Sequence, residues 1–219
     1  MIPVKDSPNA KTRLAGLLSL EERRRLARAM FEDVSRAVAG ALKPDCIVMV
    51  TSLASAIERA RELGWDVLIE ESQVSESASV DWASRVLGER GFEAVMRLPA
   101  DLPLVRAEDI DGLLSIELDS PGALIVPSRD GTGTNSVIRT PPTLFPSRFG
   151  PDSFALHQEE AARVGVKCVV VKNTRIALDI DEPADVELLF DKGRGTETFA
   201  ALIEMGVLER LERDKAKTL

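Results

Sequence analysis

Short apolar runs alternate with amphipathic segments along most of this chain. After the capping-box pattern Ser19-x-x-Glu22, apolar residues recur at helical spacing, which predicts a long helix ending near Gly40. The same spacing predicts further helices over residues 53–63, 79–90, 107–114, 152–164, 183–190 and 197–213. Buried strands are predicted over residues 46–50, 65–69, 94–98, 123–126 and 166–171, with short apolar runs at 1–4 and 176–178.

The order of these elements predicts an α/β fold, in which helices cover both faces of a central sheet. Pro3 cannot donate to a sheet ladder, so we expect it at the end of its strand. The chain contains no internal repeat, low-complexity tract or linker, and this favours one main domain.

Composition narrows the possible functions. The chain has 219 residues, of which 44% are hydrophobic, and its 28 basic and 36 acidic residues give a net charge of −8. A protein that binds duplex nucleic acid normally carries a basic face, so we expect no nucleic-acid partner. No apolar stretch approaches the roughly 20 residues that span a bilayer, so we expect no membrane partner either. Cys46 and Cys168 lie in apolar runs as buried thiols, and without a signal peptide the expected location is the cytoplasm.

The chain has a single histidine, His157, which excludes His-rich zinc chemistry. An enzyme of this composition would depend on carboxylates, cations and a metal. His157 lies one turn inside a predicted helix, where a packed or surface role is favoured over a catalytic one.

The loop after the first predicted strand carries Lys5, Lys11 and Arg13 against one acid, Asp6. Three cations on one loop suit a polyphosphate, because lysine acts as a point charge and arginine binds bidentately. A solvated basic loop is the alternative. The G-x-x-x-x-G-K-[ST] pattern of a P-loop is absent from the chain.

Carboxylates follow two other predicted strands. Asp101 lies between Pro99 and Pro103, directly after the strand at 94–98. Asp179 and Asp181 alternate along an extended segment and therefore point to the same side. Carboxylates that converge from separate strand ends make a site for a hard cation, Mg²⁺ or Mn²⁺. Capping of the helix that begins near residue 183 is the alternative reading of this pair.

Two further segments suit a small anion. Residues 130–135 carry two glycines and two threonines, whose backbone N–H groups and hydroxyls are donors, although a hairpin turn is equally consistent with them. Gly150 and Ser153 lie near the start of a predicted helix, which favours a carboxylate or phosphate. Asp152 is a candidate N-cap of the same helix.

Five ordered motifs resemble one family, the guanylyltransferases that make the phosphodiester precursor of the deazaflavin coenzyme, factor 420. Its members use 2-phospho-L-lactate, phosphoenolpyruvate or 3-phospho-D-glycerate. The resemblance covers residues 2–190 and implies a Rossmann-like nucleotidyltransferase fold with a mixed, mostly parallel sheet, related to the molybdenum-cofactor guanylyltransferases. The motifs are Ile2-Pro-Val-Lys5 with Ala10-Lys-Thr-Arg-Leu14, Leu98-Pro-Ala-Asp-Leu-Pro103, Gly131-Thr-Gly-Thr-Asn135, Phe149-Gly-Pro-Asp-Ser-Phe154 and Leu178-Asp-Ile-Asp-Glu-Pro183.

The resemblance implies a role for each motif in GMP transfer from GTP. The implied triphosphate and catalytic residues are Lys5, Lys11, Arg13 and Asp101. The implied ligands of the cofactor Mg²⁺ are Asp101, Asp179 and Asp181.

The implied partners are GTP and a small phosphorylated three-carbon acid. Thr134, Gly150 and Ser153 would bind the carboxylate end of the acid. Ser79 and Asp81 would lie beside the nucleotide, at the helix start where archaeal-type members carry Gly-Leu-Asn instead.

The resemblance divides the chain into a nucleotidyltransferase domain, residues 1–192, and a helical extension, residues 193–219. Apolar positions in the extension form a packing face for the domain or for a partner subunit, as in a homodimer. Two alternatives to the guanylyltransferase remain. One is a nucleotidyl- or sugar transferase of the same fold with another acceptor, and the other is a catalytically silent nucleotide-binding regulator.

Overall fold

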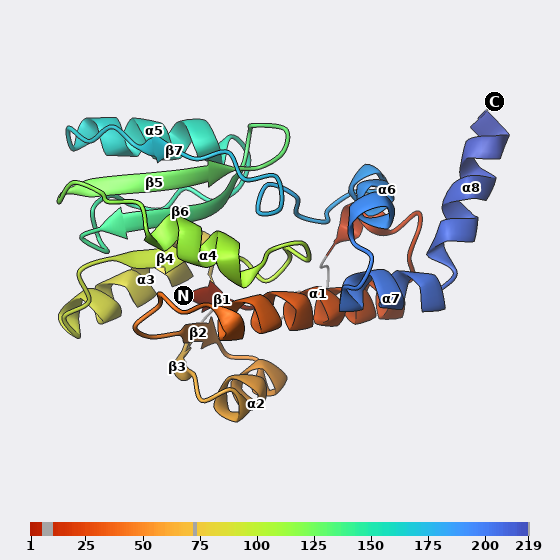
Figure 1. The fold of residues 1–219 in the computed structure, drawn as a ribbon, viewed down its shortest axis with the longest axis horizontal. Coiled ribbons are helices and arrows are strands. Elements are labelled where there is room, and N and C mark those ends of the chain that lie inside the picture. Colours follow the sequence, from red (N-terminus) through yellow and green to blue (C-terminus); the bar gives the residue numbers. More distant parts are fainter. Residues whose placement is uncertain (6–10, 72–73, 219) are drawn as a thin grey trace.

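Two neighbouring β-sheets lie on one side of the molecule, and α6, α7 and α8 lie on the other (Figure 1). The structure is a computed structural model that describes residues 1–5, 11–71 and 74–218. A three-stranded sheet has the order β1-β2-β3 and a four-stranded sheet has the order β4-β6-β5-β7. Their bounds are β1 Ile2–Pro3, β2 Val48–Thr51, β3 Asp66–Ile69, β4 Val95–Arg97, β5 Gly122–Pro127, β6 Thr134–Thr140 and β7 Val169–Val170.

The amino terminus joins the two sheets. The Met1 ammonium donates to the Met96 carbonyl at 2.6 Å, and the Leu98 N–H donates to the Met1 carbonyl at 3.1 Å. β1, β2 and β3 pair in parallel, as do β5 and β7, whereas β6 runs antiparallel to β4 and β5. The predicted mixed, mostly parallel α/β architecture is therefore confirmed. Pro3 is the last residue of β1, as expected.

Helices cover both faces of the sheets because strand residues alternate between two sides. Met49 of β2 and Leu124 of β5 pack with α1 and α4, whereas Val48 and Ala123 face α3 and α5 respectively. The helices are α1 Leu20–Gly40, α2 Ala54–Glu62, α3 Glu76–Glu89, α4 Ala107–Leu114, α5 Ser153–Arg163, α6 Pro183–Lys192, α7 Glu197–Glu204 and α8 Val207–Thr218, with a 3₁₀ turn at Thr12–Leu14.

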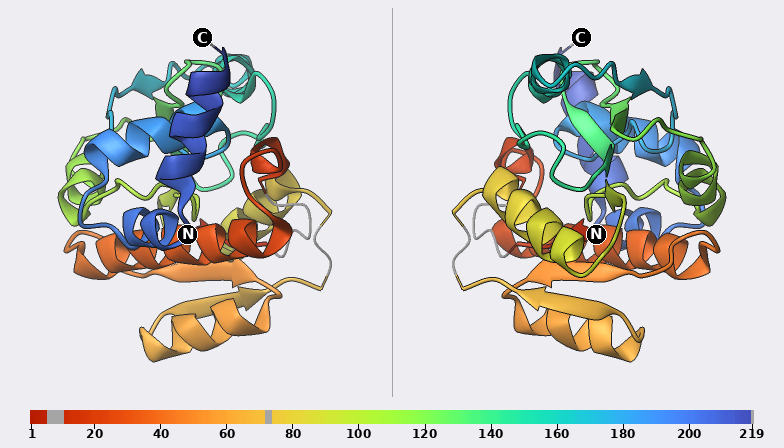
Figure 2. Two further views of the ribbon diagram at one scale, coloured as in Figure 1. Left: turned by 90° about the vertical axis from the view of Figure 1, so that its right-hand side faces the viewer. Right: turned by 90° about the vertical axis from the view of Figure 1, so that its left-hand side faces the viewer.

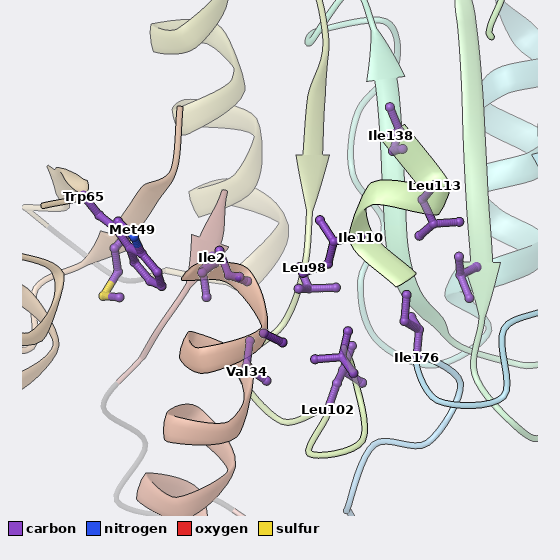
Figure 3. Close-up of a cluster of buried hydrophobic side chains, with 14 of the residues drawn as sticks. Ile2, Val34, Met49, Trp65, Leu98, Leu102, Ile110, Leu113, Ile138 and Ile176 are labelled. Carbon is purple, nitrogen blue, oxygen red and sulfur yellow. The ribbon is translucent and has the colours of Figure 1, made fainter. Parts of the chain in front are cut away.

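The largest apolar cluster lies between α1, α4 and the strands (Figure 3). Ile2 from β1, Val34 from α1 and Ile110 from α4 point toward one another in this cluster. Leu102, from the loop after β4, is fully buried in it. The cluster thus fixes the loop that carries Asp101, because the neighbouring side chain is anchored in the core.

Three predicted elements need correction. Residues 134–140 form a strand, β6, although the glycines and threonines before it indicated only a loop, and the segment before it is the turn of a β5–β6 hairpin. α3 begins at Glu76 with Ser75 as its N-cap, three residues earlier than the sequence predicts. The predicted helix 197–213 is two helices, since Gly206 has φ of 66° and ends the first of them.

The carboxyl-terminal helices pack against the start of the chain (Figure 2). Leu202 and Val207 share an apolar cluster with Leu14 and Leu26. Asp33 of α1 accepts hydrogen bonds from the first two N–H groups of α7, at 2.8 and 2.9 Å, and so holds this helix end. No helix among the described residues is both long and apolar enough to cross a membrane.

Candidate active site

A polar cleft of about 510 Å³ lies where β4 and β5 end and β6 begins. The turn between β5 and β6, the loop before α5 and the loop before α6 complete its walls. The cleft brings together sequence-predicted residues from five separate segments. These residues are Arg13, Asp101, Thr134, Gly150, Ser153, Asp179 and Asp181.

A second cavity, of about 570 Å³, lies beside α1, α4 and the turn between α6 and α7. None of the catalytic, binding or metal-ligating residues predicted from the sequence lines it. Two of its arginines are already paired, Arg36 with Glu197 and Arg175 with Asp109. The polar cleft is therefore the candidate active site.

Lys11 forms the centre of the acidic part of the site. Its Nζ donates to Asp101 Oδ2 at 2.7 Å and to Asp181 Oδ1 at 2.6 Å. Lys11 has a left-handed backbone, with φ of 55°, which is uncommon for residues other than glycine and concentrates at functional sites. Burial alone would lower the pKa of Lys11, but the two carboxylates outweigh it and raise that pKa above its ordinary value. Lys11 is thus a permanent cation.

The three predicted metal ligands differ in whether a nearby positive charge offsets their negative charge. Burial would raise the pKa of Asp101, but the Lys11 ammonium reverses this and holds that pKa below its ordinary value. Asp179 has no such partner among the described residues, and its pKa rises from 3.8 to about 6 because of burial and the negative charge of Asp101. A hydrogen bond from Asn135 Nδ2 to Asp179 Oδ1, 3.1 Å long, opposes this rise only in part.

This donor set fits a hard divalent cation by its chemistry. Its three carboxylates are accompanied by one ammonium, that of Lys11, so negative charge exceeds positive charge in this donor set. The Lys11 ammonium lies between Asp101 and Asp181 and forms an ion pair with each of them. Within the described part of the chain, no three acidic, histidine or cysteine side chains are grouped closely enough to hold a metal ion in this arrangement.

The opposite end of the cleft is lined by hydroxyl groups. The Thr134 N–H donates to Ser153 Oγ at 2.8 Å, which ties the start of β6 to the first residue of α5. Gly150 has φ of 127°, a conformation that favours glycine, in the loop between them. Asp152 is the N-cap by position, but its side chain makes no capping bond. These backbones place two hydroxyls beside a helix N-terminus, an environment that suits an anion.

His157 is packed, which is one of the two roles, packed or surface, that the sequence favoured over a catalytic one. It is fully buried, and its ring lies 4.9 Å from that of Phe149, centre to centre. Nδ1 lies 2.9 Å from Thr134 Oγ1, and Nε2 accepts from the Arg148 N–H at 2.8 Å. Burial, with the positive charge of Arg139 and Arg97, lowers its pKa to about 4, so the ring is neutral at pH 7.

Sequence reasoning missed Arg97, which lines the cleft from the end of β4. Its guanidinium lies 4.2 Å from the centre of the Phe149 ring and pairs with Glu76 at the start of α3. It also donates to the carbonyls of Thr134 and Asn135, at 3.4 and 3.2 Å. The sequence did carry one sign of a functional role for Arg97, since it is a charged residue inside the otherwise apolar strand predicted over residues 94–98.

Other predicted residues lie apart from the cleft. Ser79 is buried, and its hydroxyl donates to the Ser75 carbonyl within α3. Asp81 accepts from the N–H and hydroxyl of Ser147 and pairs with Arg139, so it anchors α3 to the loop after β6. Lys5 follows β1, but residues 6–10 of its loop, Asp6 among them, lie outside the described residues.

The fold is that of the nucleotidyltransferases. A nucleotidyl transferase from Methanothermobacter thermautotrophicus has a TM-score of 0.58 at 14% identity, covering 87% of this chain and 94% of its own. A protein from Desulfovibrio desulfuricans G20, provisionally assigned as a nucleotide-diphospho-sugar transferase, has a TM-score of 0.76 at 19% identity and covers 96% of both chains. At these identities, the likeness defines the fold class.

The chain belongs to the family described as "Guanylyl transferase CofC like", whose model matches residues 1–218. The family identified from the motifs is therefore confirmed, and the match continues beyond residue 190 through the carboxyl-terminal helices.

Three relatives each cover most of their own length. The phosphoenolpyruvate guanylyltransferase of Rubrobacter xylanophilus is 35% identical over 88% of this chain and 93% of its own. The 3-phospho-D-glycerate guanylyltransferase of Colwellia psychrerythraea is 33% identical over 86% and 89%. The 2-phospho-L-lactate guanylyltransferase of M. thermautotrophicus is 31% identical over 90% and 85%.

Proposed function

We propose that this protein transfers GMP from GTP to the phosphate of a small three-carbon phospho-acid and releases pyrophosphate. The names of the relatives supply the acceptor class: phosphoenolpyruvate, 3-phospho-D-glycerate or 2-phospho-L-lactate. The observation that carries the proposal is a single cleft with two chemically different ends. Hydroxyls and a helix N-terminus line one end, and carboxylates line the other, two of which bind the ammonium of Lys11 behind them.

The hydroxyl end suits the carboxylate of the acceptor. Thr134 and Ser153 offer short, uncharged donors, and the first turn of α5 adds its dipole. The size of the cleft, about 510 Å³, suits two small anionic groups held close together. Binding the acid at this end orients its phosphate toward the acidic cluster around Asp101.

In the transfer, an oxygen of the acceptor phosphate attacks the α-phosphorus of GTP, and the bond from that phosphorus to pyrophosphate breaks. The attacking phosphate is already ionised at neutral pH, so the reaction needs no general base. A neutral, buried His157 agrees with this requirement. The task of the protein is to place two mutually repelling anions in line and to offset their charge.

Asp101, Asp179 and Asp181 would hold Mg²⁺, which when bound supplies positive charge beside the phosphates. Lys11 supplies the charge that the protein itself contributes, since its raised pKa keeps it protonated. Arg13, at the rim of the same cleft, and Lys5 would bind the departing pyrophosphate. Ser79 and Asp81 have structural partners of their own, so we assign them no contact with the base.

The test is pyrophosphate release from GTP and Mg²⁺, measured separately with each of the three acceptors. We expect turnover with at least one acceptor and none when the acceptor is omitted. Asp101→Asn should lower that turnover by about 100-fold or more, whereas the same change at Asp191, which is exposed on α6, should not. Silence of the folded wild-type protein with all three acids would overturn the proposal.

A further inference from the structure

His157 is a buried polar group that the proposed reaction does not use. It is the one histidine of the chain. Both of its ring nitrogens have hydrogen-bond partners in the segments that form the hydroxyl end of the cleft. One partner is the Thr134 hydroxyl of β6, and the other is the Arg148 N–H in the loop before α5. The ring therefore touches groups next to the cleft without lining the cleft itself.

The Arg148 contact fixes which nitrogen carries the proton. A backbone N–H can only donate, so Nε2, 2.8 Å from the Arg148 nitrogen, must be the bare acceptor. In a neutral ring the hydrogen is then on Nδ1, which lies 2.9 Å from Thr134 Oγ1. The Ser153 carbonyl, one helical turn back, is a second acceptor near the ring and also favours a protonated nitrogen.

The tautomer in turn fixes the polarity of the Thr134 hydroxyl. Because Oγ1 accepts from Nδ1–H, its own hydrogen is left to donate to another group. Ser153 is in the same situation, since its Oγ accepts from the Thr134 N–H at 2.8 Å. Neither hydroxyl hydrogen has an acceptor among the residues that the structure describes, and both residues line the cleft.

We propose that His157 is a positioning residue that makes the Thr134 hydroxyl a donor toward the acceptor's carboxylate. The role rests on the proposed function, because the carboxylate is the group that would take the hydrogen. Two interior donors, the His157 ring and the Thr134 N–H, thus orient two hydroxyls before the acid binds. A carboxylate accepts hydrogen bonds only, so a site with fixed donors favours it over a neutral amide or alcohol.

The state of the ring can be measured without substrate or variant. In protein labelled with ¹⁵N-histidine, the single residue gives one pair of ring nitrogen signals, so no assignment is needed. We expect the pattern of the Nδ1–H tautomer at pH 7. An Nε2–H tautomer or a charged ring would overturn the proposal, whether or not the protein turns over GTP.

Two substitutions test the consequence for the acceptor. The side-chain amide of His157→Asn lies near the former Nδ1 and can still donate to Thr134, whereas that of His157→Gln lies nearer the former Nε2. His157→Gln should raise KM for the acceptor about tenfold while kcat and KM for GTP stay within about twofold, as expected when uniform binding is lost. His157→Asn should stay within about threefold of the wild type.

The outcomes separate the inference from the proposed function. Equal effects of His157→Gln on both substrates, or a fall in kcat alone, would overturn the positioning role while the reaction stands. Wild-type silence with every acceptor would overturn the reaction, and the carboxylate role with it. If the variants fail to fold, the ring spectrum of the wild type decides.

Discussion

Replacing Asp179 by asparagine should stabilise the folded protein at neutral pH while it removes activity. The side chain is partly buried, and its ordinary pKa of 3.8 rises to about 6 because burial and the charge of Asp101 disfavour the ionised form. At pH 7 the folded state therefore holds a carboxylate that it would bind more favourably as the neutral acid. Asparagine keeps the shape and an oxygen for the Asn135 amide, without the charge.

The expected gain in the free energy of unfolding follows from the pKa of Asp179. That pKa rises from 3.8 to about 6, and at 1.36 kcal/mol for each pH unit this gives an upper bound of about 3 kcal/mol. We expect about half of this, about 1.5 kcal/mol, because the cleft is open to water. For a chain of this length, this corresponds to a rise in Tm of about 4 °C.

The sign of the pH dependence is specific. The pKa of Asp179 is higher in the folded state than in the unfolded state. The folded wild type therefore has its full free energy of unfolding below the pKa of the unfolded state, and it loses part of this free energy as pH rises through about 6. The advantage of Asp179→Asn over the wild type should therefore be largest above pH 7. It should fall to about 0.5 kcal/mol at pH 4.5, where the folded wild type is already protonated.

The assay is urea unfolding of wild type and variant at pH 7.5 and pH 4.5, with turnover measured in parallel. Asp181→Asn is the matched control, since it removes a carboxylate two residues away that is paired with Lys11. The control should gain no stability and should lose up to about 1 kcal/mol. An Asp179→Asn protein that is less stable than wild type at pH 7.5, or equally stabilised at both pH values, would refute the reasoning.

Three further predictions concern other parts of the fold. Asp101→Asn should lower kcat by about 100-fold or more in steady-state assays while circular dichroism stays unchanged, because it removes one of the three carboxylates that would hold Mg²⁺ beside the phosphates; activity within tenfold of wild type would contradict this. Thr134→Val keeps the branched shape without the hydroxyl, so acceptor titrations should give a KM about tenfold higher at similar kcat; an unchanged KM would exclude Thr134 from the acceptor site. Asp33→Ala frees the N–H groups that begin α7 and should cost about 1–3 kcal/mol in urea unfolding with no change in KM; an unchanged unfolding midpoint would refute that capping role.

The sequence predicted the elements whose signals are local. The capping box at Ser19 and Glu22 forms as expected, with bonds of 3.3 and 2.8 Å. Asp101, Asp179 and Asp181 were predicted to converge because each follows a strand or an extended segment, and they line one cleft. β6 was missed because its residues follow a Gly- and Thr-rich turn, and its pairing with β4 and β5 depends on segments far away in the chain.

The partners of charged groups could not be predicted in the same way. Lys11 was expected to face the triphosphate, whereas its ammonium lies between two carboxylates that come from 90 and 170 residues away. Arg97 and Asn135 reach the site only through tertiary contacts with Thr134 and Asp179. Ser79 and Asp81 were chosen from the family resemblance at the expected start of this helix, and α3 begins three residues earlier, at Glu76.

The most direct test of the central claim uses GTP labelled in either the α- or the γ-phosphate, together with the acceptor that gives turnover. We expect the α-label to appear in a guanylylated acid and the γ-label in pyrophosphate, in equal amounts. With Asp101→Asn both products should form at least about 100-fold more slowly. An α-label that appears as GDP or free GMP, with the acceptor unchanged, would contradict transfer in this cleft.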